Sequence, residues 1–175
     1  MKLPKSEHEE KAPKILSFAL ITVSSSRYKS RLKGEVFTDE SQELGASIIQ
    51  SAGHVVGIRD LVDDDVNMIR SRLNGLLENE DLDVIIFIGG TGFSKKDVTI
   101  EAVKPLFERE VEGFGELFRW MSFQEIGAAA ALSRATMGVI GDKVVMCLPG
   151  SPHAVKLALK IFMKELPHLI YILRS

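Results

Sequence analysis

The chain has 175 residues, of which 45% are hydrophobic and 26% are charged, and its formal net charge is -2. This length suits one domain with a substantial core and is short for two. The slight negative charge argues against a polyanion such as DNA as the main ligand, because nucleic-acid-binding proteins usually carry a basic excess. No apolar run approaches the roughly 20 residues of a membrane span, and residues 1–14 are too charged for a signal peptide. We therefore expect no nucleic acid and no membrane as partner, and the cytoplasm as location.

Cys147 is the only cysteine. An intrachain disulfide and a cysteine zinc cluster are therefore excluded, which is typical of a reducing compartment. Because Cys147 lies within an apolar run, we expect it in the core and not as a nucleophile.

The first half of the chain alternates predicted strands and helices. Residues 1–13 contain two prolines and little to bury, so they are expected to form a flexible arm that precedes a single domain at 14–175. The expected elements are a strand at 14–24, a polar loop without periodicity at 25–38, a helix at 39–53 with Asp39 as its cap, a strand at 54–62, a helix at 63–79 and a strand at 82–90. The last strand is apolar on both faces, as in a buried parallel sheet.

The second half continues the alternation with shorter elements. The expected elements are a helix at 99–111 that Pro105 bends or ends, a helix at 113–127, a segment at 128–141 that suits either helix or strand, a strand at 144–149 and one long amphipathic helix at 150–173. Repeated strand and helix alternation predicts an α/β fold, because right-handed crossovers place helices on both faces of a sheet. The expected architecture is a three-layer α/β/α sandwich with a mostly parallel central sheet.

Ligands of such sheets bind outside the carboxyl ends of the strands. The segments that follow the four main strands are "SSSRYKSR", "DLVDDD", "GGTGFSKKD" and "LPGSPH". Glycines let backbone amides approach an anion, hydroxyl groups donate further hydrogen bonds, and lysines or arginines neutralise its charge. The four segments together indicate a site for a nucleotide or another phosphorylated ligand.

Two aspartates in these segments indicate a metal ion. Carboxylates beside a phosphate would repel it unless a divalent cation lies between them, so Asp64 and Asp97 point to Mg²⁺. Simpler interpretations stay open, because "GGTG" also suits a tight turn and one of the residues 63–65 must be an ordinary helix cap. The glycine segment fits neither the Walker pattern nor the dinucleotide pattern.

Three longer stretches, "GGTGFSKKDVTIEA", "EGFGELFR" and "ALSRATMGVIGDKVVMCLPGSPHAV", resemble the molybdopterin-binding domain of molybdenum cofactor biosynthesis, the MoaB/MogA type. The resemblance covers the chain from Lys14 onward. It implies the three-layer fold, assembly into trimers or hexamers, and adenylylation of molybdopterin by magnesium ATP to give adenylyl-molybdopterin and pyrophosphate. A molybdenum-insertase protein is a further partner that it suggests.

The resemblance also implies roles for individual residues. Asp64 and Asp97 are expected to act in catalysis through magnesium or its water shell, with Asp63 and Asp65 leaving the register of the first aspartate open by one residue. The residues expected to bind substrate are Gly89, Gly90, Thr91, Gly92, Thr99, Glu101, Pro149, Gly150 and Ser151, with Arg27 and Lys95 as charge partners.

One departure and two alternatives accompany the resemblance. The family often has Ser-Asp-x-Arg after its first strand, whereas this chain has Ser25 at the aspartate position. One alternative is a protein of the same fold that binds the pterin without adenylylating it. The other is a related domain with different chemistry, as in molybdenum-insertase or nucleotide-pyrophosphatase proteins.

Overall fold

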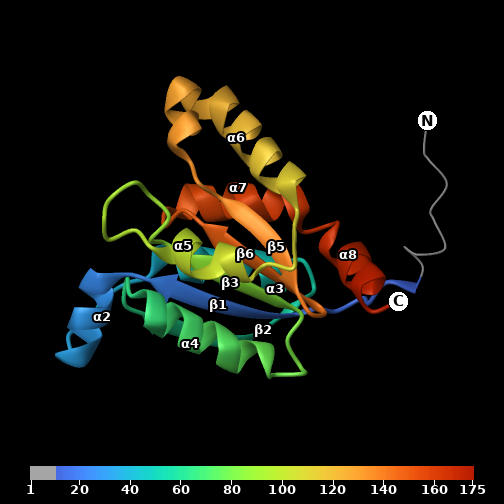
Figure 1. Ribbon diagram of the computed structural model, residues 1–175, viewed down its shortest axis with the longest axis horizontal. Helices are drawn as coiled ribbons and strands as arrows, with labels where there is room; N and C mark the ends of the chain where they lie inside the picture. The colour runs from blue at the N-terminus through green and yellow to red at the C-terminus, as the bar shows by residue number, and fades with distance from the viewer. Residues whose placement is uncertain (1–10) are drawn as a thin grey trace.

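A computed structural model describes residues 11–175, so the expected arm at 1–13 lies almost wholly outside the described residues. Its strands form one six-stranded sheet in the order β2-β1-β3-β6-β5-β4 (Figure 1). In chain order the elements are β1 (Ser17–Val23), α2 (Ser25–Leu32), α3 (Glu40–Ser51), β2 (Val55–Val62), α4 (Val66–Leu77), β3 (Val84–Ile88), α5 (Thr99–Val103), the 3₁₀ helix η1 (Lys104–Leu106), β4 (Arg109–Glu110), α6 (Glu112–Ile126), the 3₁₀ helix η2 (Gly127–Leu132), β5 (Thr136–Ile140), β6 (Lys143–Leu148), α7 (Pro152–Phe162) and α8 (Leu166–Leu173).

The sheet is mostly parallel, as expected. β1 pairs in parallel with β2 and β3, and β3 pairs in parallel with β6. Only β5 and the short β4 run antiparallel to their neighbours. The carboxyl ends of four strands therefore meet at one edge of the sheet, where the four polar segments follow them.

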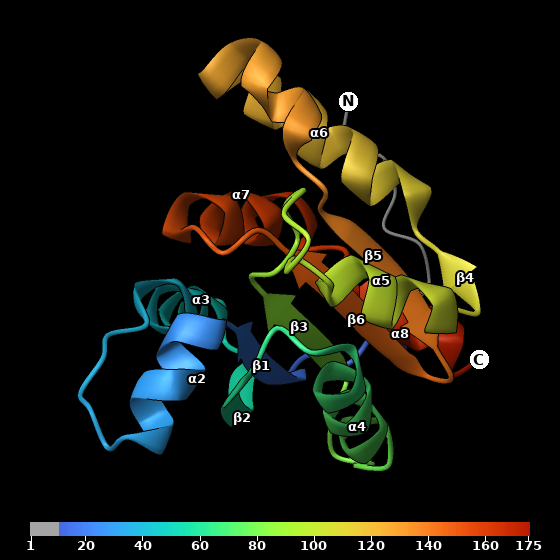
Figure 2. The same ribbon diagram turned by 60° about the vertical axis from the view of Figure 1, so that its left-hand side comes forward.

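Alternating side chains of the strands build two cores, one on each face of the sheet. In β1, Phe18 and Leu20 pack into a cluster with α3, α6, α7 and α8, whereas Ala19 and Ile21 pack into another with α4 and α5. Figure 2 shows α3 and α7 on one side of the sheet and α4 and α5 on the other. This arrangement confirms the three-layer α/β/α sandwich.

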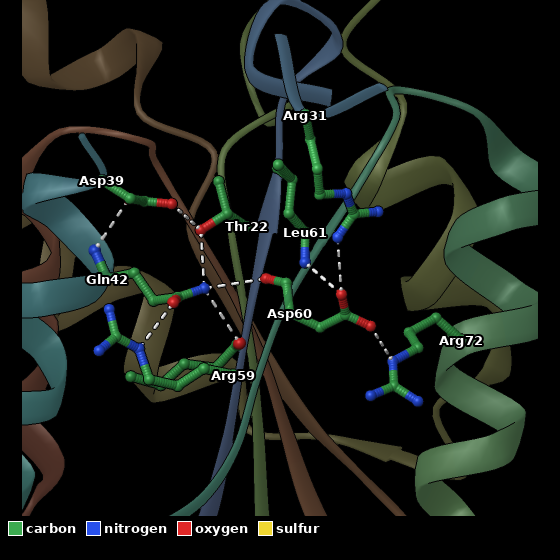
Figure 3. A network of polar contacts seen from close by, with 9 residues as sticks. Thr22, Arg31, Asp39, Gln42, Arg59, Asp60, Leu61 and Arg72 are labelled. Atoms are coloured by element: carbon green, nitrogen blue, oxygen red, sulfur yellow. Dashed lines mark hydrogen bonds and ion pairs between the residues drawn. The ribbon is translucent and has the colours of Figure 1, made fainter. Parts of the chain in front are cut away.

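A partly buried polar network ties α3 to the two strands beside it (Figure 3). Asp39 caps α3 as expected, since its carboxylate accepts from the Gln42 amide at 3.1 Å and from the Thr22 hydroxyl at 2.5 Å. The Gln42 side chain in turn donates to the Asp60 carbonyl of β2 at 2.9 Å and accepts from Arg59 at 2.8 Å. The network holds the start of α3 against the carboxyl edge of the sheet.

The polar loop expected at 25–38 was wrong for its first half, which forms α2. No residue of α2 is buried, so the helix has no apolar face from which a periodic pattern could arise. It is stabilised instead by Ser24, whose side chain accepts from the Arg27 amide, and by Arg31, which pairs with Asp60 of β2 at 3.0 Å.

The long helix expected at 150–173 was also wrong, because the chain breaks it into α7 and α8. Pro167 lies in the first turn of α8, where its missing amide donor is tolerated; within a continuous helix it would break the ladder. The segment at 128–141 divides into η2 and β5. The helix expected at 99–111 ends before Pro105, as allowed for, but the rest of that range was wrong, because it forms η1 and the edge strand β4. No helix within residues 11–175 has the length and apolar character needed to span a membrane.

Candidate functional site

A cavity of about 380 Å³ lies at the carboxyl edge of the sheet. The segments after β3 and β6 line it together with the stretch that joins η2 to β5. Its lining residues are Gly89, Gly90, Thr91, Gly92, Asp97, Leu132, Ser133, Arg134, Pro149, Gly150 and Ser151. The structure thus brings together eight residues that the sequence analysis had proposed as site residues.

Backbone geometry makes glycine necessary in the segment Gly89–Gly92, which we call the glycine loop. Gly89 has φ 105° and Gly90 has φ 62°, both in the left-handed region that side chains disfavour. A Cβ on Gly89 would also overlap the carbonyl oxygen of Val23, and Gly150 packs so that its own Cβ would lie 3.3 Å from Gly89 Cα. The two loops are therefore in contact through backbone alone.

Thr99 supports the glycine loop through hydrogen bonds and does not line the cavity. It is fully buried, its hydroxyl donates to the Gly89 carbonyl at 2.8 Å, and its amide donates to the Gly90 carbonyl at 2.9 Å. Its hydroxyl is thereby used within the protein. The position of Thr99 supports a role in shaping the loop, although the sequence had suggested a contact with substrate.

The three consecutive aspartates after β2 do three different things. Asp65 is the N-cap of α4 and accepts from the Met68 amide at 2.8 Å. Asp63 accepts from the amide of its neighbour Asp64 at 2.8 Å. Asp64 points toward the glycine loop, because a Cβ built on Gly90 would lie 2.8 Å from its Oδ1 atom. The expected ordinary cap is thus Asp65, and Asp64 is the aspartate that faces the site.

Asp97 approaches the same loop from the other end. A Cβ on Gly92 would lie 2.8 Å from Asp97 Oδ2, and this oxygen accepts from the Ser94 amide at 2.9 Å. The amide of Asp97 donates back to the Ser94 carbonyl at 2.9 Å, which closes a tight turn. The turn that was the simpler interpretation of "SKKD" is therefore present, and it presents a carboxylate to the cavity.

The loop after β6 brings a helix N-terminus to the cavity. Ser151 caps α7 and accepts from the Ala154 amide at 3.1 Å, and Pro152 occupies the first turn. Ser41 of α3 donates to the Gly150 carbonyl at 2.6 Å and so fixes the loop from behind. Pro152 has no amide hydrogen and the Ala154 amide is used by Ser151, so it is the helix dipole that makes this end favourable for an anion.

Besides Thr99, four residues proposed from the sequence do not line the cavity: Arg27, Asp64, Lys95 and Glu101. Arg27 donates through Nε to the Thr38 carbonyl at 3.1 Å and so braces the segment that follows α2. Lys95 is exposed in the loop between Gly92 and Asp97. Glu101 lies at the rim, where it pairs with Arg134 at 2.6 Å, and this hydrogen-bonded guanidinium lowers the pKa of its carboxyl group.

A second cavity of about 620 Å³ adjoins the first one. The two cavities share Ser133 and Arg134 as lining residues. The walls of the larger cavity come from α5, η1, β4, α6 and the segment after η2, and they include the ion pair of Lys104 with Glu110 at 2.8 Å. The carboxyl edge of the sheet thus has two neighbouring cavities, and ligands bound in them would approach each other at Arg134.

Comparison with known proteins places these loops in a family. The family model described as "Probable molybdopterin binding domain" matches residues 19–168, a range that contains every residue lining the smaller cavity. The chain belongs to the MoaB/MogA family of molybdenum cofactor biosynthesis.

Relatives of this MoaB/MogA-family chain match it over nearly its whole length. "Molybdenum cofactor biosynthesis protein B" of Bacillus cereus is 42% identical, over 95% of each chain. "Probable molybdopterin adenylyltransferase" of Methanocaldococcus jannaschii is 37% identical, over 93% of this chain and 96% of its own. The crystal structure of the tungsten cofactor synthesizing protein MoaB from Pyrococcus furiosus has a TM-score of 0.82 at 37% identity, covering 94% of this chain and 100% of that one. These matches confirm the resemblance drawn from the sequence.

Arg134 is the residue of this MoaB/MogA-family site that sequence reasoning missed. It lines both cavities and donates to the carbonyl oxygens of Thr91 and Gly92 at 2.9 and 2.6 Å. The only signal in the sequence was the arginine in "ALSRATMG", a stretch whose secondary structure was ambiguous. Cys147, by contrast, lies fully buried in the core as expected, and burial raises the pKa of its thiol.

Proposed function

We propose that this MoaB/MogA-family protein transfers AMP from magnesium ATP to the phosphate of molybdopterin, giving adenylyl-molybdopterin and pyrophosphate. The observation that carries the proposal is one cavity in which the glycine loop, the start of α7 and the Asp97 carboxylate meet. The name of the archaeal relative, an adenylyltransferase, supports the same activity.

The phosphate of molybdopterin is assigned to the backbone of the two loops that are in contact. The amides of the glycine loop after Gly89 supply donors and the dipole of α7 favours the negative charge, and Thr91 and Ser151, which carry hydroxyls, are among the lining residues. Thr91 is only 4% exposed, so its side chain is held in one place. Donors fixed in advance lose little entropy when the ligand binds.

The donors around the glycine loop fit a magnesium ion that arrives with ATP. Asp64 and Asp97 each use the Oδ2 atom within the protein, and the structure shows no cluster of three metal-ligating side chains within residues 11–175. Mg²⁺ is commonly bound by one or two carboxylates together with substrate phosphates, which suits this pair better than a resident cage would. When bound, the ion would neutralise charge on the phosphates of ATP.

The proposed reaction needs no strong general acid or general base from the protein. An oxygen of the molybdopterin phosphate, already anionic at neutral pH, attacks the α-phosphorus of ATP; the new O–P bond forms as the bond to the β-phosphate oxygen breaks, and pyrophosphate leaves with that electron pair. The lining of the smaller cavity includes no histidine and no cysteine among its described residues, which is consistent with chemistry that needs no general base. Positioning two polyanions and balancing their charge supplies the catalysis.

The adjoining cavity is assigned to the second substrate. Its lining combines three cations, Lys104, Arg119 and Arg134, with three carboxylates, Glu110, Glu112 and Glu116. It meets the glycine-loop cavity at Arg134, so ATP placed there would reach the phosphate bound at the loop. Two cavities that share a wall suit a reaction that joins two substrates.

We also propose that the protein is a homo-oligomer, a trimer or a hexamer. α6 extends away from the sheet in both ribbon views, and along it Trp120, Phe123 and Ile126 are 61, 55 and 54% exposed (Figures 1 and 2). Large apolar side chains that gather on one projecting helix favour burial against another subunit. Light scattering at micromolar concentration tests this, and a monomer would contradict it.

One assay tests the proposed activity. Purified protein is incubated with molybdopterin and magnesium ATP, and adenylyl-molybdopterin and pyrophosphate are measured in equal amounts. Tight binding of molybdopterin without formation of the product would instead support the non-catalytic pterin-binding alternative. Absence of both would contradict each of these functions.

A further inference from the structure

Arg134 grips the glycine loop through two consecutive carbonyl groups. Its Nε donates to the Thr91 carbonyl at 2.9 Å and one terminal nitrogen donates to the Gly92 carbonyl at 2.6 Å. The planar guanidinium offers these donors in a fixed fork, which a lysine could not reproduce. Two successive peptide groups of the loop are therefore held in one orientation by a single side chain.

Glu101 and Phe93 hold the guanidinium in place. Glu101 accepts from the two terminal nitrogens of Arg134 at 2.6 and 3.4 Å, and the Arg134 guanidinium carbon lies 5.1 Å from the centre of the Phe93 ring. Most of the guanidinium donors are thereby used within the protein, which leaves Arg134 little to offer a ligand directly. Its influence on a ligand has to pass through the loop.

That influence falls on the next two amides. In a planar trans peptide the N–H group points opposite to the carbonyl group, so fixing the Thr91 and Gly92 carbonyls toward Arg134 turns the amides of Gly92 and Phe93 away from it. Among the described residues these two amides have no acceptor, whereas the following amide, that of Ser94, donates to Asp97. Adjacent amides without partners form a concave donor site for an anion.

We propose that Arg134, oriented by Glu101, is a positioning residue that aims the Gly92 and Phe93 amides at a ligand phosphate. The inference rests on the proposed function for the identity of that ligand and deepens it. It also changes the role of Glu101, which the sequence had suggested as a substrate contact: Glu101 acts through Arg134.

The test uses the intact protein and pyrophosphate as the probe, whose phosphate groups stand in for the molybdopterin phosphate that the glycine loop is proposed to bind. Backbone amide NMR signals of Gly92 and Phe93 are followed during a pyrophosphate titration in wild type, Arg134→Lys, Glu101→Gln and the double variant. Asp142→Asn is the matched control, because it weakens an arginine–carboxylate pair, with Arg174 at 3.2 Å, in the β5–β6 turn at the edge of the sheet away from the glycine loop. Melting temperatures establish that each variant is folded.

In wild type and Asp142→Asn, both amide signals shift on binding. In Arg134→Lys the shifts collapse and pyrophosphate binds on the order of tenfold more weakly, the factor expected for a lost charge-assisted hydrogen bond. Glu101→Gln has a smaller effect of the same kind and adds little in the Arg134→Lys background, because the two side chains act in series.

Two results would overturn the inference: amides of Gly92 and Phe93 that ignore pyrophosphate in wild type, or shifts that persist in a folded Arg134→Lys protein. Failure of the proposed function looks different. In that case the amides respond to pyrophosphate and depend on Arg134, yet wild type forms no adenylyl-molybdopterin.

Discussion

Ser25 donates both its backbone amide and its hydroxyl to one oxygen of Asp64, at 2.6 and 2.9 Å. The second carboxylate oxygen of Asp64 therefore points toward Gly90. Ser25 is the first residue of α2, so the start of that helix sets the direction of the carboxylate. Where relatives are expected to have an aspartate, this chain has a neutral donor that binds Asp64 without adding charge.

Replacing Ser25 with alanine should slow the proposed adenylylation several-fold. The substitution removes the hydroxyl bond to Asp64 and keeps the amide bond, a loss of about 1 kcal/mol in orientation of the carboxylate. Molybdopterin affinity and melting temperature should stay close to wild type. Ser26→Ala, at an exposed position in the same turn, is the control. Equal rates in Ser25→Ala and Ser26→Ala would show that the hydroxyl is irrelevant to turnover.

Asp64→Asn and Asp97→Asn should separate binding from turnover. Each removes a negative charge that repels the molybdopterin phosphate, so molybdopterin alone should bind as well as before or slightly better. Turnover with ATP should fall by orders of magnitude, a loss of several kcal/mol, because the proposed magnesium ion would lose a ligand or a partner of its water shell. Rates are measured at limiting and at saturating magnesium.

Asp65→Asn provides the matched control for that pair. Asp65 caps α4, and asparagine is a comparably good cap, so stability and activity should hardly change. If Asp64→Asn behaved as mildly as Asp65→Asn at both magnesium concentrations, the metal assignment would be wrong and the aspartates would be structural.

The two threonines beside the glycine loop should respond differently to valine. Thr91→Val removes a hydroxyl that lines the cavity and should weaken molybdopterin binding by about 1–3 kcal/mol with little change in melting temperature. Thr99→Val leaves the buried Gly89 carbonyl without its hydroxyl donor, so stability itself should fall by about 1–3 kcal/mol. Calorimetry and ligand titration on both variants check the contrast; a stable Thr99→Val protein would contradict it.

His54 should make the fold sensitive to mild acid. Its Nδ1 accepts from the Leu16 amide at 3.2 Å, and burial lowers its pKa, an effect that the nearby Asp83 charge opposes. Because the folded pKa lies below the unfolded value of about 6.5, the unfolded chain binds the proton first. Stability is therefore full above pH 6.5 and is lost as the pH falls through the folded pKa.

His54→Asn keeps an acceptor near the same place and cannot titrate. Denaturant unfolding between pH 7 and 5 should consequently show a smaller loss of stability in this variant than in wild type. A wild-type slope in His54→Asn would assign the acid sensitivity to other groups.

Sequence patterns predicted those parts of the fold that depend on apolar burial. β1 and β3 were evident because both of their faces are buried, and the layers followed from the alternation of elements. The sequence did not predict α2, because a helix without a buried side cannot be distinguished from a polar loop by its hydrophobic periodicity. The break before α8 was signalled by Pro167, but a continuous amphipathic pattern outweighed it.

The site was predictable in its backbone and less so in its side chains. Glycines at strand ends indicated the loop, since positive φ angles leave few alternatives. Three identical aspartates could not be told apart without knowing which one caps α4. Arg134 could not be found, because it comes to the loop from the end of a 3₁₀ segment that the chain's local pattern leaves undefined.

The contact of Gly89 with Gly150 makes the stability of the fold depend on the concentration of bound ligand. These glycines belong to loops after β3 and β6, which meet only when the two strands are paired. An unfolded chain has no such site, so bound ligand holds the chain in its folded form by mass action, by about 2.7 kcal/mol at a hundredfold excess over the dissociation constant. With molybdopterin as the proposed ligand, the protein in a cell starved of pterin would be degraded faster by proteases, and its abundance would follow the supply of that ligand.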